Sequence, residues 1–69
     1  MTNNDHRLSN TNEAFRLLNA GEVASILNIS LGFAYQLMKR GDVPTIHLGR
    51  AVRVRPVDLE LYIEKNAST

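Results

Sequence analysis

The fold of this 69-residue chain is decided by residues 19–41, which read NAGEVASILNISLGFAYQLMKRG. Asn19 is a good helix cap, and Glu22 stands three residues later, where the acid of a capping box belongs. Apolar residues then recur at the i, i+3, i+4, i+7 spacing of one helix face: Ala20, Val23, Ala24 and Leu27. The pattern predicts a first helix that ends near Leu27.

A connection of three residues follows, Asn28-Ile29-Ser30. Asn28 can end the first helix because asparagine tolerates the left-handed conformation, and Ser30 can cap the next helix. The second apolar stripe, widened by Leu37, consists of Leu31, Ala34, Tyr35 and Met38. It predicts a helix to about Arg40, stopped by Gly41. Two helices joined by so short a turn predict a helix-turn-helix.

Residues 45–54 alternate apolar and polar residues on both sides of Gly49, which predicts a β-hairpin. We expect a three-residue loop at 49–51, because this loop places Leu48 opposite Val52 and keeps the apolar residues on one face.

The register decides which polar side chains point outward. With the three-residue loop, His47 and Arg53 share the outer face and Arg50 projects at the tip. A two-residue turn would send Val52 and Val54 to the other face.

A last helix is predicted from Pro56, because the fixed φ of proline suits the first helical position. Asp58 favours that end of the helix dipole. The apolar stripe of this helix is Leu59, Tyr62 and Ile63. Tyr35 and Tyr62 are expected in the core with their hydroxyl groups at the surface.

The expected fold class is mainly α with a small β-hairpin (α+β), in one domain over residues 15–65. Residues 1–14 are rich in Asn, Thr and Ser and predict a flexible N-terminal tail, and residues 66–69 predict a frayed C-terminus.

Basic residues are concentrated in one segment. The whole chain has a net charge of +1, but residues 39–55 contain five Lys or Arg against one carboxylate, Asp42. Such a segment suggests a surface that faces a polyanion. The alternative is an ordinary solvated charge run.

Composition excludes several classes of function. The chain has no cysteine, so disulfides, thiolate zinc sites and thiol catalysis are excluded. His6 and His47 lack the spacing of metal ligands, and no apolar run approaches the ~20 residues of a membrane span. No secretory signal is expected. We therefore expect a cytoplasmic protein without metal or cofactor. It is not expected to be an enzyme, because no nucleophile–base pair, acid pair or phosphate loop is present.

The second helix and the hairpin each carry cations away from their apolar stripe, which suits duplex DNA. A major groove about 12 Å wide admits one helix, and a hairpin beside it can reach phosphates or the adjacent minor groove. The candidate DNA-binding residues of the helix are Gly32, Phe33, Gln36, Lys39 and Arg40. Those of the hairpin, which would form a wing, are His47, Arg50, Arg53 and Arg55.

Each helix candidate has a functional and a structural interpretation. The Gln36 amide can bond adenine, or it is a surface helix former. Phe33 touches a thymine methyl group or packs under the hairpin. Gly32 permits close approach to a phosphate, or it is a tolerated first-turn glycine. Lys39 and Arg40 contact phosphates, or they form a solvated helix end.

The hairpin candidates differ in the same way. Arg50 and Arg53 are expected to point outward to DNA. His47 donates to a phosphate if protonated, or it is an ordinary strand residue. Arg55 contacts DNA, or it caps the last helix or pairs with Asp58.

Several short motifs lie within residues 17–63: Leu17-Leu18-Asn19, Glu22-Val23-Ala24, Leu27-Asn28-Ile29-Ser30, Ala34 to Pro44 with its Tyr35, Gly41 and Pro44, Leu48-Gly49-Arg50, Val52-Arg53-Val54 and Asp58-Leu59. With these motifs the chain resembles the excisionase-type winged helix-turn-helix domain, a relative of the MerR DNA-binding head. The resemblance implies a factor from a mobile genetic element that binds double-stranded DNA near attachment sites. Such factors bend DNA and help a site-specific integrase to excise.

From the small number of cations we expect cooperation between copies on DNA or with an integrase. Related domains also serve as small transcriptional regulators, which the domain alone does not distinguish. A third interpretation is a protein-interaction adaptor without a nucleic-acid role. It predicts that Arg50→Glu and Arg53→Glu leave the DNA affinity unchanged.

Overall fold

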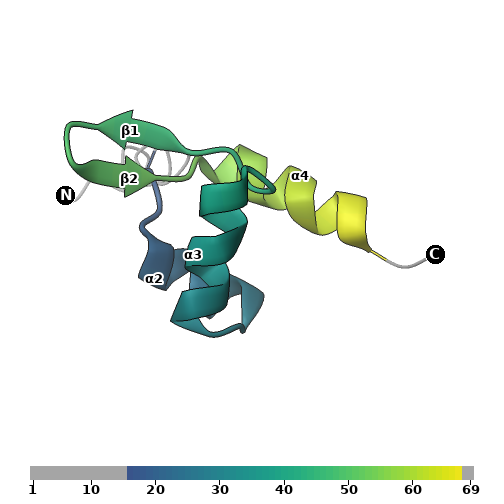
Figure 1. Ribbon diagram of the computed structural model, residues 1–69. Helices are drawn as coiled ribbons and strands as arrows, with labels where there is room; N and C mark the ends of the chain where they lie inside the picture. Colours follow the sequence, from purple (N-terminus) through teal and green to yellow (C-terminus); the bar gives the residue numbers. More distant parts are fainter. Residues whose placement is uncertain (1–15, 68–69) are drawn as a thin grey trace, which may run out of the picture.

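The computed structural model describes residues 16–67, in which a short antiparallel hairpin projects from a group of three helices (Figure 1). The helices and strands are α2 (Ala20–Leu27), α3 (Leu31–Arg40), β1 (Ile46–Leu48), β2 (Ala51–Arg53) and α4 (Pro56–Asn66). The predicted class, mainly α with a β-hairpin, is confirmed. The tail predicted at residues 1–14 lies outside the described residues, and α4 includes Asn66, where fraying was expected.

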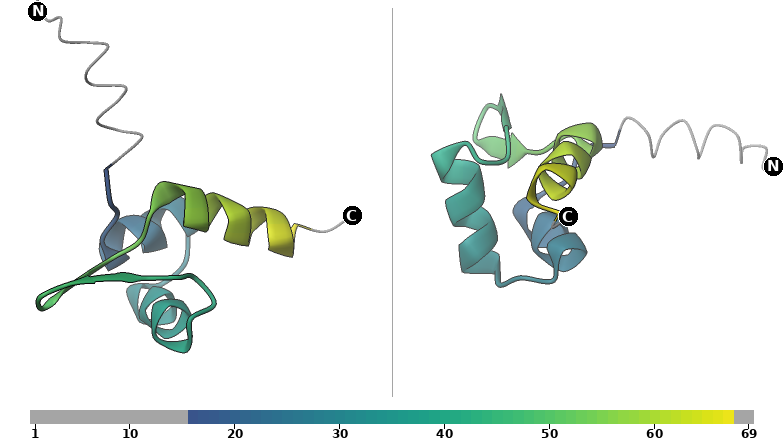
Figure 2. Two further views of the ribbon diagram at one scale, coloured as in Figure 1. Left: turned by 90° about the horizontal axis from the view of Figure 1, so that it is seen from above. Right: turned by 90° about the vertical axis from the view of Figure 1, so that its right-hand side faces the viewer.

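The caps of α2 and α3 are those that the sequence predicts. The Asn19 side chain accepts a hydrogen bond from the Glu22 N–H at 2.8 Å, and Glu22 accepts from the Asn19 N–H at 2.9 Å. Asn28 ends α2 in the left-handed conformation, with φ 57° and ψ 48°. Ser30 then caps α3 by accepting from the Phe33 N–H at 3.1 Å. These local bonds fix a tight turn, so α2 and α3 lie side by side (Figure 2).

The core lies where the helices meet the base of the hairpin. Val23 of α2, Val43 after α3 and Val54 after β2 are all fully buried. The other buried apolar residues are Leu18, Ala20, Ala24, Ala34, Leu37, Met38 and Leu59. On α4, Tyr62 packs against this core as predicted, whereas Ile63 is 43% exposed, contrary to the predicted stripe.

Leu31 and Tyr35 do not belong to the core, and the prediction that placed them there is wrong. Their exposed fractions are 50% and 56%. The predicted stripe and the observed stripe share Ala34, Leu37 and Met38, and their centres differ by less than the ~100° between successive helical residues. The packing of α3 against α2 selects the rotation that buries Leu37 fully, and this rotation turns Leu31 and Tyr35 outward.

The hairpin has a two-residue turn, Gly49-Arg50, and the predicted three-residue loop is wrong. The paired residues are Ile46 with Arg53, His47 with Val52, and Leu48 with Ala51. Gly49 has a φ of 63°, which suits the first central position of a type II′ turn. Leu48 is 53% exposed, so no core contact at the hairpin tip forces the apolar residues onto one face.

This register also corrects the predicted positions of His47 and Arg53. Residues directly opposite in an antiparallel pair share a face, so His47 lies on the face of Val52 and Arg53 lies on the face of Ile46. Val52 packs against the core. His47 therefore lies on the face turned toward the helices, and Arg53 lies on the opposite face.

A third short segment ties the hairpin to the rest of the domain. Leu18 and Val54 exchange two backbone hydrogen bonds of 2.8 Å each. This bridge places the residues that lead into α2 beside the residues that follow β2. The hairpin consequently lies across the C-terminal end of α3 and projects away from α4 (Figures 1 and 2).

Candidate nucleic-acid interface

Six of the seven exposed residues of α3 form two ridges at four-residue spacing, and Phe33 is the seventh. One ridge, which we call the outer ridge, contains Gly32, Gln36 and Arg40; the other, the wing-side ridge, contains Leu31, Tyr35 and Lys39. All six residues are exposed, and the ridges lie opposite the buried Ala34, Leu37 and Met38. A helix with a free face of this kind can enter a major groove.

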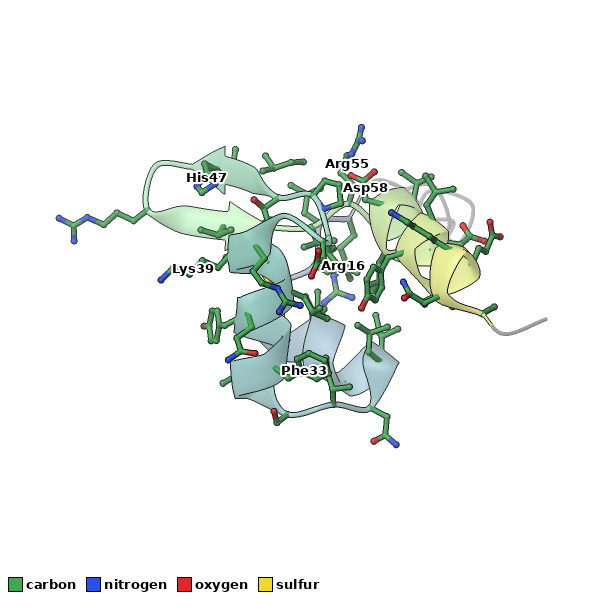
Figure 3. The ribbon with its side chains drawn as sticks, turned by 45° about the vertical axis from the view of Figure 1, so that its right-hand side comes forward. Arg16, Phe33, Lys39, His47, Arg55 and Asp58 are labelled. Atoms are coloured by element: carbon green, nitrogen blue, oxygen red, sulfur yellow. The ribbon has the colours of Figure 1, made fainter. Side chains whose placement is uncertain are left out.

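The wing, defined as residues 46–53, borders the wing-side ridge through two shallow hollows. Tyr35 and Lys39 line the first hollow together with His47 and Val52. Leu31 and Tyr35 line the second together with residues 50–53 and the first residues of α2. Figure 3 shows Lys39 extending from α3 below the hairpin that carries His47. The helix and the wing thus form one concave surface, with Tyr35 at its centre.

Ion pairs divide the cations of residues 39–55 into two groups. Arg40 pairs with Asp42 at 2.7 Å, and Arg55 pairs with Asp58 at 2.7 Å. Lys39, Arg50 and Arg53 form no ion pair within residues 16–67. The three cations without a carboxylate partner therefore all border the concave surface, where the paired Arg40 also lines the first hollow.

Arg53 is half-buried, and its Nη1 donates to the carbonyl oxygen of Val52 at 2.9 Å. This bond keeps the guanidinium at the strand, beside the hollow that Arg50 also lines. Although Arg53 lies on the outer face of the strand, it lines this hollow together with Arg50, Leu31 and Tyr35, so both arginines border the wing-side ridge of α3.

Arg55 serves the fold. It is the N-cap residue of α4, and its Nε and Nη2 donate to the two carboxylate oxygens of Asp58 at 2.7 and 3.0 Å. Of the predicted structural interpretations, the pairing with Asp58 is the one observed, because the Arg55 side chain makes no capping hydrogen bond. Both residues lie on the side of the molecule away from Lys39 (Figure 3).

The bond to Asp58 also fixes the charge of Arg55. The hydrogen bond and the charge of the carboxylate together raise the pKa of Arg55 above its ordinary value. When folding raises the pKa of a base, the ion pair stabilises the folded state at every pH below the ordinary pKa of that base. This stabilisation is lost only as the pH rises through the raised pKa, which for arginine is strongly alkaline. Arg55 therefore remains protonated under any condition used to study DNA binding.

The remaining helix candidates occupy different parts of α3. A Cβ atom added to Gly32 would meet no atom within 4 Å, so the backbone there is open to a ligand. Gln36 lies next along the same ridge. Phe33, 43% exposed, lies on the lower part of α3, far from the hairpin (Figure 3). The interpretation that Phe33 packs under the hairpin is therefore wrong.

Sequence reasoning missed Leu31 and Tyr35 as members of this surface. Both were assigned to the core because they fit the apolar stripe of α3. A signal was present: together with Lys39 they form an i, i+4, i+8 series, which is a single ridge on a helix. Only the packing of α3 shows that this ridge is exposed.

A helix-turn-helix whose second helix and β-wing border one cationic surface defines a winged helix-turn-helix DNA-binding domain. Residues 17–67 match the helix-turn-helix domain family, and the chain belongs to this excisionase-like family of DNA-binding domains. No curated protein and no solved structure gives a significant match.

Two features are absent from residues 16–67. No helix in this part of the chain is long and apolar enough to cross a membrane. No group of three or more His, Cys, Asp or Glu in the same residues could hold a metal ion.

Proposed function

We propose that this protein is an excisionase, a recombination directionality factor that binds and bends DNA near attachment sites and assists a site-specific integrase in excision. The observation that carries the proposal is the concave surface on which Lys39 of α3 and Arg50 and Arg53 of the wing lie together. The recombination role is supported by the family of the chain, which is excisionase-like.

The proposed contacts divide between the two elements. α3 enters the major groove, where the Gln36 amide can bond adenine and the open backbone at Gly32 permits close approach. Arg50 and Arg53 bind phosphates of the flanking backbone, and Lys39 binds a phosphate at the edge of the same groove. Phosphate contacts of this kind fix the orientation of the protein, whereas base contacts supply specificity.

The small number of free cations supports an assisted mode of binding. Lys39, Arg50 and Arg53 provide about three phosphate contacts per copy, few for tight binding by one copy. Bending a site of 20–30 base pairs costs on the order of 1–6 kcal/mol. Several copies side by side, or one copy in contact with an integrase, would supply the additional binding free energy.

The test is a reconstituted excision reaction. A plasmid that carries the two junctions of the mobile element is incubated with the element's integrase, with and without the protein. We expect excision to require the protein, and the Arg50→Gln/Arg53→Gln variant to lose this effect. Lys65→Gln, which removes an exposed cation on α4, is the matched control and should retain it.

Bending is measured separately, by the gel mobility of fragments that carry the bound site at different positions. Specific, bent complexes together with no effect on excision would contradict the recombination role and favour a transcriptional regulator. DNA affinity that does not change in Arg50→Glu/Arg53→Glu would favour the adaptor interpretation.

A further inference from the structure

The wing-side ridge of α3 combines exposed apolar side chains with free cations. Leu31 and Tyr35 are 50% and 56% exposed, although each has a large apolar surface. Lys39 continues the ridge at its C-terminal end. Arg50 and Arg53 border the second hollow, which Leu31 and Tyr35 line. Within residues 16–67 none of these three cations has an ion-pair partner.

This combination indicates what covers the ridge. A protein partner that covered the two apolar side chains would also have to neutralise the cations around them. A DNA major groove meets both requirements, because phosphates line its edges and the thymine C5-methyl group is an apolar feature on its floor. The ridge is continuous with the outer ridge that carries Gln36, so one helix insertion brings both ridges to the bases.

We infer that Leu31 and Tyr35 are specificity-determining residues that read thymine methyl groups in the target site. The inference rests on the proposed DNA-binding surface and deepens it. Gln36 supplies the polar contact on the outer ridge, and the two apolar side chains select thymine at neighbouring positions. The preferred site therefore contains thymines at fixed places within the major groove that α3 occupies.

The position of Tyr35 adds a constraint. Tyr35 lines both hollows between α3 and the wing, so the thymine that it contacts lies on the wing side of the groove. Leu31 is the first residue of α3 and lies about six ångströms further along the ridge, at the 1.5 Å rise per residue of a helix. Two residues at this separation reach neighbouring base pairs, which predicts two methyl-sensitive positions close together.

The experiment removes the methyl group from DNA without changing base pairing. Duplexes that bind the protein are first selected from random double-stranded DNA. In the best duplex each thymine is then replaced singly by deoxyuridine, and the affinities are measured by fluorescence anisotropy at one salt concentration. At one or two positions we expect uracil to weaken binding about fourfold, the change that corresponds to burying one methyl-sized group.

The protein variants show which side chain senses the methyl group. Leu31→Ala and Tyr35→Ala should each bind the thymine and uracil duplexes equally at one sensitive position, while Tyr35→Phe keeps the discrimination. Leu61→Ala, which shortens an exposed side chain on α4, is the control and should discriminate as the unaltered protein does. Circular dichroism checks that each variant is folded.

Three results would overturn the inference, and they are distinguishable. If the unaltered protein bound every uracil duplex as tightly as the thymine duplex, the methyl groups would not be recognised, and the DNA-binding function would remain. Uracil sensitivity that persists in both alanine variants would assign the effect to DNA shape. A protein that selects no duplex at all would remove the DNA-binding function together with the inference.

Discussion

Removal of the two wing arginines should flatten the salt dependence of DNA binding. Each phosphate contact made by a cation contributes a slope of about −0.9 to the plot of log K against log salt concentration. With Lys39, Arg50 and Arg53 as the free cations of the concave surface, the predicted slope is about −2.7 per copy. In Arg50→Gln/Arg53→Gln only Lys39 remains, and the predicted slope is about −0.9.

The difference is large enough to measure. Between 50 and 200 mM salt, a slope of about −2.7 weakens binding roughly 40-fold, whereas a slope of about −0.9 weakens it only three- to fourfold. The assay is a titration by fluorescence anisotropy at several salt concentrations, on a duplex with a single site so that one copy binds. Glutamine removes the charge and keeps most of the length of the side chain.

Two control variants make the result specific to the surface. Lys65→Gln removes a cation on α4 that has no ion pair within residues 16–67 and should leave the slope unchanged. Arg55→Gln should also leave it unchanged, because Arg55 is bonded to Asp58 on the other side of the molecule. Equal slopes for the unaltered protein and the double wing variant would refute the assignment of the wing as a phosphate-binding element.

Three further predictions concern stability and are read from thermal and urea unfolding. Leu37→Ala should lower the free energy of unfolding by about 2–5 kcal/mol, because Leu37 is only 2% exposed. This loss is comparable with the whole free energy of unfolding expected for a domain of this size, ~3–5 kcal/mol. Leu61→Ala should change stability by no more than about 0.5 kcal/mol, and an equal loss in both variants would contradict the core assignment. Asn28→Val should lower the free energy of unfolding by about 1–2 kcal/mol, because the backbone at position 28 is left-handed. Asn28→Gly should leave stability nearly unchanged, and a glycine variant less stable than the valine variant would contradict the turn geometry. Asn19→Ala removes the capping box and should cost about 1 kcal/mol, so unchanged stability would show that this cap contributes nothing.

The local structure of this protein could be predicted from its sequence because it depends on neighbouring residues. The capping box of Asn19 and Glu22, the left-handed Asn28 and the Ser30 cap each join groups within about one helical turn. Pro56 at the start of α4 likewise acts on its own backbone. For the same reason the sequence could predict the helix-turn-helix, the hairpin and the basic segment that suggested DNA binding.

The residues that form the proposed DNA-binding surface could be identified only from the tertiary structure. Tyr35 fits a buried stripe and an exposed ridge equally well in the sequence, and only the packing of α3 against α2 selects the exposed one. The two-residue turn at Gly49 moved His47 to the inner face of the hairpin, because Leu48 at the tip has no core to pack against. The sequence by itself determined where the helices begin, where α2 and α3 end, and where the positive charge lies along the chain. The ion pairs that leave Lys39, Arg50 and Arg53 free join near neighbours, Arg40 with Asp42 and Arg55 with Asp58. Which side chains border the concave surface depended on residues distant in sequence, such as Tyr35 and Val52, which line the same two hollows. A pattern of neighbours contains no information about such contacts.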